Sequence, residues 1–172
     1  MSERPLLLLD FDGPLNPYRA RKPPTGYERH EIVEGAKTWS VLLNQQHGVE
    51  LNALADVFQL VWATSWEHGA NRLLAPLLGL PDDLPVIIWP EGARESAAGP
   101  MRPQSWKTPY VAEWVGGRPF VWIDDEVNQR DRAYLSTVDG IGPHLLHRVD
   151  ASRGLLQGDF DAVRNWRYGS RR

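Results

Sequence analysis

The chain has 172 residues, of which 42% are apolar and 24% charged, and its formal net charge is −3. These values are ordinary for a soluble globular protein with one core, and they give no support for non-specific coating of nucleic acid. The absence of cysteine excludes disulfides, thiolate metal sites and cysteine nucleophiles, and it favours a cytoplasmic location. We find neither a signal peptide nor an apolar segment of membrane-spanning length.

The first predicted element is a buried strand in residues 6–9. Four consecutive leucines form a continuous apolar run, which is typical of a parallel strand covered on both faces. Asp10 and Asp12 follow at once, and we place them at the carboxyl end of the strand because isolated buried charge is costly. Two close carboxylates repel unless a cation lies between them or one is protonated. Asp10 and Asp12 are therefore a candidate Mg²⁺ site and a candidate nucleophile and general acid/base pair.

Residues 14–26 are rich in proline and basic side chains, and we predict an irregular loop that covers or borders this site. Residues 27–33 and 38–44 each alternate weakly between apolar and polar side chains. Glu34 and Gly35 lie between them as a turn. This pattern predicts a β-hairpin, and a helix from Glu34 is the alternative.

A helix in residues 47–57 and a second buried strand in residues 58–63 are expected next. The strand ends at Thr64 and Ser65, ahead of a predicted helix in residues 66–78. Hydroxyl groups at such a junction are often only helix N-caps. The same position also directs a hydroxyl and backbone N–H groups towards an anion above the sheet. Both interpretations stay open.

Residues 86–89 predict a third strand, and residues 90–105 predict a loop without periodicity. A helix should follow to about residue 115, with Thr108 as its N-cap and a proline in its first turn. Lys107 would then lie beside the carboxyl edge of the sheet. A lone lysine is more often a solvated side chain, so this position alone does not define a site.

The fourth apolar run, residues 119–123, ends in Asp124, Asp125 and Glu126. Consecutive acids can simply mark a helix N-terminus, and a helix is predicted in residues 127–138. The acids nevertheless repeat the arrangement found after the first strand. Two parallel strands that deliver carboxylates to one edge of a sheet predict a divalent-cation site.

A fifth strand is predicted in residues 144–149, followed by a last helix with Asp159 as its cap. The alternation of strands and helices predicts one doubly wound α/β domain with a parallel sheet. We expect this single domain to span residues 1–172, with a core in about 5–168. A flap hairpin would lie within about 14–46.

Taken in order, the strand ends carry Asp-x-Asp, then Thr, then Lys, then Asp-Asp. This pattern resembles the haloacid dehalogenase (HAD) superfamily, largely Mg²⁺-dependent phosphohydrolases, over roughly residues 6–149. The segments DFDGPLNPY, VWATSWEHGAN and FVWIDDE are similar to the HAD domain of Swiss Army Knife RNA repair proteins. The resemblance implies a three-layer, Rossmann-like HAD fold and a phosphatase.

The resemblance implies catalytic roles for four residues. Asp10 would be the nucleophile that forms an aspartyl-phosphate. Asp12 would protonate the leaving group and then activate water, and it would ligate Mg²⁺ through its backbone carbonyl. Lys107 would neutralise the nucleophile and the phosphate, and Thr64 would bind the phosphoryl oxygens.

The remaining implied roles concern the phosphate and the cation. Ser65 is the less favoured candidate, after Thr64, for the hydroxyl that binds phosphate. Gly13 would lie against the bound phosphate. Asp124 would ligate Mg²⁺ directly, and Asp125 directly or through water, beside Asp10. Mg²⁺ prefers a few carboxylates together with waters and substrate oxygens, which this set provides.

The chain leaves little room for an inserted cap domain, so we expect a minimal flap and an open site. Such a site admits a phosphorylated small molecule, a nucleic-acid end or a phosphoprotein. The basic and aromatic residues that could border the end of a nucleic-acid strand are Arg19, Arg21, Lys22 and Trp106. Pro14 departs from the Thr or Val found here in many HAD proteins, which stiffens the turn without removing a ligand.

Two alternatives to a phosphatase remain. A HAD-like fold can bind phosphorylated ligands without turnover. A signalling receiver domain also uses Asp, Thr and Lys on a parallel sheet, but its phosphoacceptor Asp lies mid-chain and its Lys comes last. Here an acid pair follows Lys107, which disfavours the receiver.

Overall fold

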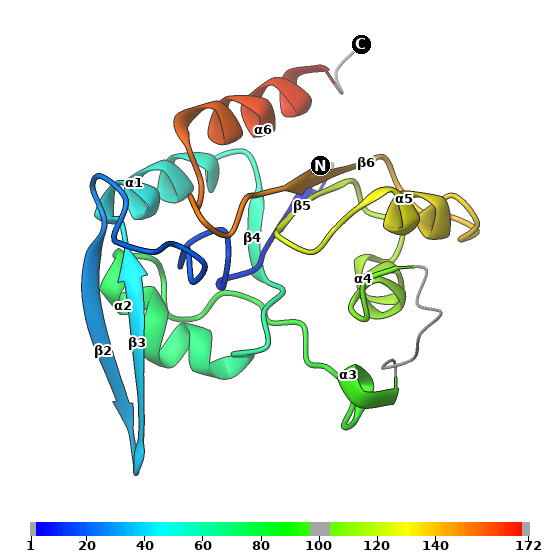
Figure 1. Cartoon of the computed structure of the whole chain (residues 1–172). Coiled ribbons are helices and arrows are strands. Elements are labelled where there is room, and N and C mark those ends of the chain that lie inside the picture. The colour runs from blue at the N-terminus through cyan, green and yellow to red at the C-terminus, as the bar shows by residue number, and fades with distance from the viewer. Residues whose placement is uncertain (1–2, 97–103, 170–172) are drawn as a thin grey trace.

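The computed structural model describes residues 3–96 and 104–169 and contains a four-stranded parallel sheet with strand order β4-β1-β5-β6 (Figure 1). The strands are β1 (Leu6–Leu9), β4 (Gln59–Trp62), β5 (Phe120–Asp124) and β6 (His144–Arg148). β1 lies between β4 and β5, and Leu9 is level with Trp62 on one side and Ile123 on the other. Because all the pairings are parallel, the carboxyl ends of these strands lie at the same edge.

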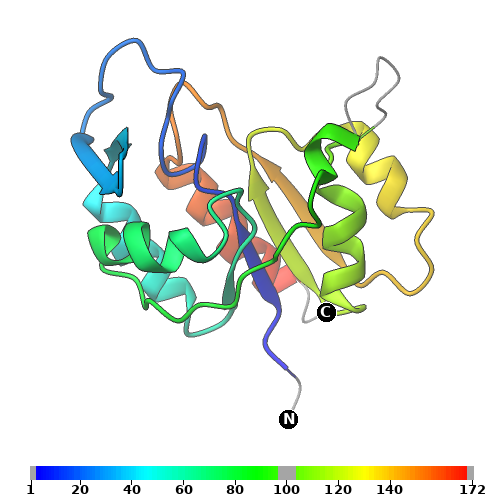
Figure 2. The same cartoon turned by 90° about the horizontal axis from the view of Figure 1, so that it is seen from below.

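Helices cover both faces of the sheet (Figure 2). One face packs against α1 (Gln45–Leu54), the π-helical turn η1 (Ala70–Leu74), α2 (Ala75–Leu78) and α6 (Gln157–Gly169). The other face packs against α4 (Thr108–Val115) and α5 (Gln129–Leu135). The predicted three-layer, doubly wound α/β fold is confirmed. Within the described residues, none of the helices is long and apolar enough to cross a bilayer.

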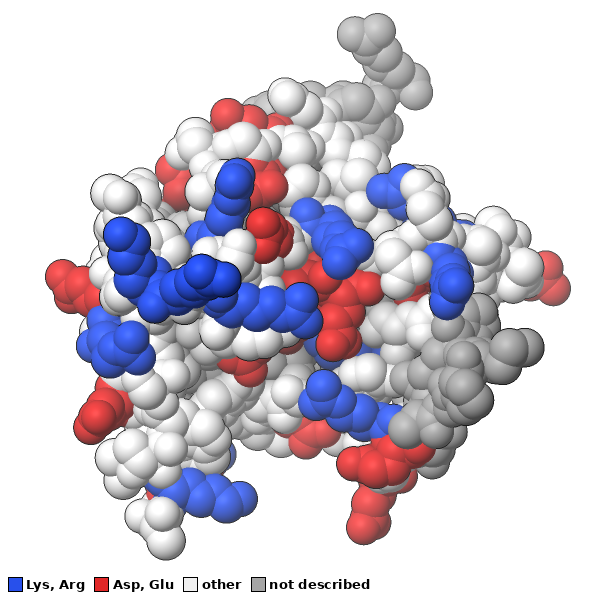
Figure 3. Space-filling view, in the orientation of Figure 1, with Lys and Arg blue, Asp and Glu red and all other residues white. Residues whose placement is uncertain are grey.

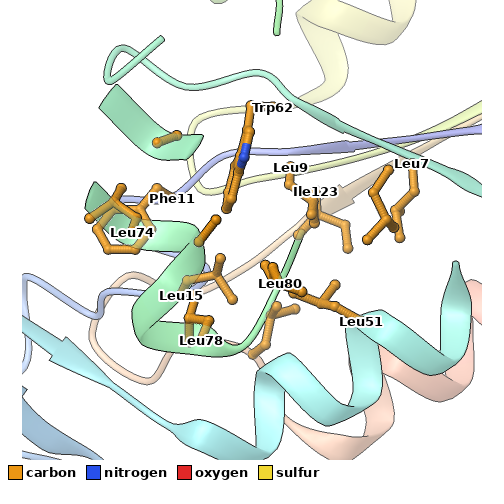
Figure 4. Close-up of a cluster of buried hydrophobic side chains, with 14 of the residues drawn as sticks. Leu7, Leu9, Phe11, Leu15, Leu51, Trp62, Leu74, Leu78, Leu80 and Ile123 are labelled. Carbon is orange, nitrogen blue, oxygen red and sulfur yellow. The ribbon is translucent and has the colours of Figure 1, made fainter. Parts of the chain in front are cut away.

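The four leucines of β1 divide between two apolar cores. Leu7 and Leu9 point to the core shared with α1, α2 and α6, where Leu51 packs against them (Figure 4). Leu6 and Leu8 point to the core under α4 and α5. All four side chains are fully buried, and each such burial stabilises the fold by about 1.5–3 kcal/mol. This burial holds β1 in the middle of the sheet and fixes the position of the residues that follow it.

The predicted hairpin is confirmed, and the alternative helix is wrong. β2 (Glu28–Glu34) pairs antiparallel with β3 (Lys37–Leu43), and Glu34 faces Lys37 across the turn. Side chains on one face of the hairpin, Ile32, Val41 and Leu43, join the core of α1 and α2. The hairpin therefore forms a short flap that is fixed to the body of the protein beside the carboxyl edge of the sheet.

The predicted third strand is wrong. Residues 86–89 form only a single bridge, between Val86 and Trp62. Proline cannot donate a backbone hydrogen bond, and Pro85 and Pro90 flank this segment. The predicted loop of residues 90–105 contains a short helix, α3 (Ala93–Ser96), and its residues 97–103 lie outside the described part.

The structure also corrects the predicted N-termini of three helices. The helix expected from residue 66 begins at η1 because Glu67 has a positive φ of 46°. Thr108 is not an N-cap, since Lys107 takes that position without a capping side chain. The last helix begins at Gln157, and Asp159 instead accepts a hydrogen bond from the backbone N–H of Leu156.

His47 of α1 is buried. Its Nε2 donates to the Leu155 carbonyl at 2.9 Å, and among the described residues its buried Nδ1 has no partner. The rings of Tyr27 and Phe160 pack against it. Burial lowers the pKa of His47 below its usual 6.5, against the opposing hydrogen bond to Leu155 and the charges of nearby carboxylates.

We expect the free energy of unfolding to decrease as the pH falls below about 6.5, because the unfolded chain then binds a proton that folded His47 excludes. His47→Gln should remove this part of the pH dependence. Urea unfolding of both proteins between about pH 5 and pH 8 measures it. Identical pH slopes in the two proteins would contradict a neutral, buried His47.

Candidate active site

The acids that follow β1 and β5 meet at the carboxyl edge of the sheet. Asp10 comes directly after β1, Asp124 ends β5, and Asp125 follows it. Since β1 and β5 are neighbours, the Asp10 N–H donates to the Ile123 carbonyl at 3.0 Å. One carboxylate oxygen from each of the three aspartates lies within 4.8 Å of the others. The structure therefore brings together the acids of two strands that are more than a hundred residues apart in the sequence.

Lys107 lies against this acidic cluster. Its Nζ is 2.8 Å from Asp124 Oδ2 and 3.1 Å from Asp10 Oδ2, and all three side chains are buried. Burial lowers the pKa of Lys107, but the charges and hydrogen bonds of the two aspartates outweigh this effect and raise it. Lys107 is thus a buried, charged group rather than a solvated one.

The cluster is short of positive charge. Three carboxylates against one lysine leave two negative charges when all are ionised. Burial raises the pKa of Asp10, Lys107 opposes the rise, and Asp124 adds to it, with a net upward shift. Burial, and then the charge of Asp124, also raise the pKa of Asp125. A bound divalent cation would balance these charges, and carboxylate oxygens suit a hard metal ion. The three aspartates can therefore hold a metal.

The side chain of Asp12 points elsewhere. Its Oδ1 accepts from Asn16 Nδ2 at 2.8 Å, and its Oδ2 accepts from Trp66 Nε1 at 3.0 Å. Asn16 also accepts from the backbone N–H of Leu42 in the flap. The metal role predicted for Asp12 used its backbone carbonyl, so the direction of its side chain does not oppose it. Asp12 is fixed in place by both the flap and the segment after β4.

Thr64 and Ser65 differ sharply in exposure. Thr64 is fully buried, and its hydroxyl accepts from the Trp66 backbone N–H at 3.3 Å. Ser65 is exposed and lines the same cavity as Asp10 and Lys107. The geometry favours Ser65 as the side chain that reaches a ligand, although sequence reasoning favoured Thr64. Which of the two binds phosphate stays a prediction.

Gly13 allows the turn after β1 to touch the acid pair after β5. Its φ is 97°, and a Cβ at this position would lie 2.5 Å from Asp125 Cγ. Any side chain would therefore displace a metal-ligand candidate. Two further contacts hold Asp125: the Tyr18 hydroxyl donates to its Oδ2 at 3.0 Å, and Arg148 Nε donates to its backbone carbonyl at 3.1 Å.

Several of the residues of the site line a cavity of about 380 Å³. Its lining consists of Asp10, Asp12, Tyr18, Ser65, Arg94, Trp106, Lys107, Asp125 and Glu126. Figure 3 shows a face of the molecule on which acidic side chains gather near the centre, with lysines and arginines on several sides. The cavity is open to solvent, and residues 3–96 and 104–169 contain no separate cap domain over it.

Sequence reasoning missed several supporting residues, namely Asn16, Tyr18, Trp66, Asp131 and Arg148. Asn16 and Tyr18 lie in the segment DFDGPLNPY, so their short spacing from Asp12 was an available signal. Trp66 meets Asp12 from 54 positions away and Arg148 meets Asp125 from 23. No local pattern encodes such contacts.

Asp131 joins the Lys107 segment to the loop after β5. It is fully buried, and its Oδ1 accepts from the Ser105 backbone N–H at 2.7 Å and from the Thr108 hydroxyl at 2.5 Å. Its Oδ2 accepts from the Asn128 backbone N–H at 2.7 Å. One carboxylate thus positions the residues on both sides of Lys107 relative to the strand that carries Asp124.

Asp131→Ala is expected to lower the free energy of unfolding by about 2–5 kcal/mol, because three donors lose their acceptor. Asp131→Asn retains one acceptor oxygen and should fall between this variant and the native protein. Urea unfolding measures the difference, with the exposed Asp139→Ala as the control. Equal stability of Asp131→Ala and the control would show that these hydrogen bonds are unimportant.

The fold and the site together define a class. A parallel α/β sheet with Asp-x-Asp after a central strand, a buried lysine and an acid pair after the neighbouring strand has the arrangement of the HAD superfamily. The model of the family described as "HAD domain in Swiss Army Knife RNA repair proteins" matches residues 6–157, and the chain belongs to this family. Neither a curated protein nor a solved structure matches the chain.

Proposed function

We propose that the protein is a Mg²⁺-dependent phosphohydrolase that cleaves phosphomonoesters through an aspartyl-phosphate on Asp10. One observation carries this proposal: Asp10 lines a solvent-open cavity, its carboxylate lies 3.1 Å from Lys107 Nζ, and carboxylate oxygens of Asp124 and Asp125 lie within 4.8 Å of it. A carboxylate nucleophile, a fixed cation and a group of metal-ligand oxygens are the parts that phosphoryl transfer requires.

The first step transfers the phosphoryl group to the protein. A carboxylate oxygen of Asp10 forms a bond to phosphorus while the bond from phosphorus to the ester oxygen breaks. Asp12, in its protonated form, gives its proton to the departing oxygen. The Phe11 backbone N–H, which donates to Asp10 Oδ1 at 2.8 Å, and Lys107 hold the nucleophile in a single orientation.

The second step releases phosphate. Asp12 is now a carboxylate and accepts a proton from a water molecule, whose oxygen attacks phosphorus. The bond between phosphorus and Asp10 breaks, and Asp12 returns to its protonated form. The hydrogen bonds from Asn16 and Trp66 keep Asp12 in position for both proton transfers.

Positive charge lowers the repulsion between Asp10 and a phosphate dianion. Lys107 supplies one fixed charge beside the nucleophile. Asp10, Asp124 and Asp125, with the Asp12 carbonyl, would hold Mg²⁺. When bound, Mg²⁺ would neutralise phosphate oxygens and orient the substrate.

A nucleic-acid end is a second candidate substrate. The family to which the chain belongs is that of HAD domains in Swiss Army Knife RNA repair proteins. Arg94 and Trp106 line the cavity, and the Arg94 guanidinium lies 6.0 Å from the Trp106 ring centre. Arg19 lies 5.5 Å from the ring centre of Tyr18, another lining residue. Paired cations and aromatic rings of this kind suit a single strand near its phosphorylated end.

Phosphate release by the purified protein tests the proposal. The substrates are phosphorylated oligonucleotides, mononucleotides and sugar phosphates, each measured with Mg²⁺, with EDTA, and with Mg²⁺ restored. We expect release that EDTA abolishes and Mg²⁺ restores. Release in EDTA would contradict metal dependence, and phosphate-ester binding without release would favour a non-catalytic domain.

A further inference from the structure

A second cavity, which we call the flap cavity, lies between the flap and the segment that follows β4. Its volume is about 640 Å³. It is lined by Asp12, Asn16, Glu34, Thr38, Trp39, Ser40, Val41, Ser65, Trp66, Gly69 and Arg72. The flap therefore forms one wall of a second recess beside the site.

The flap cavity and the active-site cavity share two lining residues, Asp12 and Ser65. The carboxylate of Asp12 is turned towards the flap cavity, because both of its hydrogen-bond donors, Asn16 and Trp66, line that cavity. In the proposed reaction Asp12 gives its proton to the ester oxygen. The leaving group must then lie on the Asp12 side of the phosphate, where the flap cavity opens.

The walls of the flap cavity favour a flat aromatic group. Trp39 and Trp66 are both half-buried, and their ring centres are 5.2 Å apart at an interplanar angle of 59°. Indole rings bind nucleobases by stacking and tolerate different bases.

The charges of the flap cavity disfavour a second phosphate. Among its described lining residues the only cation is Arg72, which forms an ion pair with Glu34. Asp12 adds a further acid. An anionic leaving group would find no unpaired cation among these described lining residues, whereas a neutral ring needs none. A phosphorylated sugar with a second phosphate is therefore a poor fit.

We propose that the flap cavity binds the nucleoside of a nucleoside monophosphate unit, with its base against Trp39 and Trp66 and its phosphate at Asp10. The inference rests on the proposed function and specifies its substrate class. A free nucleotide and the terminal nucleotide of a strand present the same chemistry to this cavity.

The test compares kcat/KM for adenosine monophosphate with kcat/KM for glycerol phosphate, which has no ring. We expect the wild-type ratio to be at least about tenfold, and Trp39→Ala to bring it down to near one. Trp39→Phe keeps a ring and should retain most of the ratio. Trp114→Ala, at a partly exposed tryptophan of α4, should keep the wild-type value. Circular dichroism establishes that each variant is folded.

A wild-type ratio near one, or the same ratio in folded Trp39→Ala, would overturn the proposal. If the wild type hydrolyses neither ester, the proposed function fails, and binding is then decided separately. In that case we measure quenching of tryptophan fluorescence in Asp10→Asn by adenosine monophosphate. The quantity compared is the concentration of adenosine monophosphate that gives half-maximal quenching. An increase of about tenfold or more on adding Trp39→Ala supports the flap cavity as a nucleoside site, and an unchanged concentration contradicts it. Oligonucleotides with a terminal phosphate then identify whether strand ends or free nucleotides bind better.

Discussion

Replacing Asp10 with asparagine is expected to lower phosphate release by at least about 10³-fold. An amide does not displace the ester oxygen, so no covalent intermediate forms. The side chain keeps its size, and the variant carries one negative charge fewer beside Asp124 and Asp125. We therefore expect it to fold normally. The measurement is kcat of the purified variant at saturating Mg²⁺.

The matched control is Asp82→Asn, which makes the same chemical change at an exposed turn. It should retain wild-type kcat. Full activity in Asp10→Asn would contradict the nucleophile assignment. If Asp10→Asn is unfolded, the nucleophile is identified by trapping the phosphorylated intermediate. Native protein is incubated with ³²P-labelled substrate and quenched in acid, and peptide mapping should then place the label on Asp10.

Lys107→Met should have the second largest effect. We expect kcat to fall by about 10²–10³-fold, because a fixed positive charge beside the nucleophile is lost. Without added metal, the free energy of unfolding should also fall by about 3–5 kcal/mol, since Asp10 and Asp124 remain buried without their cation. Added Mg²⁺ should restore part of this stability by binding the folded state.

Lys37→Met, at an exposed position of β3, is the control and should match the wild type in both measurements. Urea unfolding with and without Mg²⁺ separates the structural effect of Lys107 from its catalytic effect. If Lys107→Met were as stable as the control in EDTA, the buried ion pairs would not hold the cluster together.

The acidic residues of the site could be predicted from the sequence because each of them directly follows an apolar run. The apolar run of β1 ends directly in Asp10, and that of β5 ends in Asp124 and Asp125. A buried strand excludes charge from its interior, so the acids had to lie at its end. The parallel pairing of β1 with β5 then brings the two ends together.

The rest of the site depends on packing between distant segments. Trp66 reads locally as a residue of a helix start, yet its indole N–H binds Asp12. Asp131 reads as an acid in a helix first turn, yet it also accepts from Ser105 and Thr108. Both contacts need the tertiary arrangement of loops whose sequences have no periodicity. The incorrect prediction of a third strand in residues 86–89 has a similar cause, since these apolar residues pack against the sheet without forming a ladder of hydrogen bonds.

The most direct measurement is a crystal structure of the protein with Mg²⁺ and beryllofluoride, which mimics a phosphoryl group on aspartate. We expect beryllium bonded to a carboxylate oxygen of Asp10 and one Mg²⁺ ligated by oxygens of the cluster that contains Asp124 and Asp125. Beryllofluoride on another residue, or Mg²⁺ bound away from these acids, would contradict the convergence of the two strand ends on one catalytic cation.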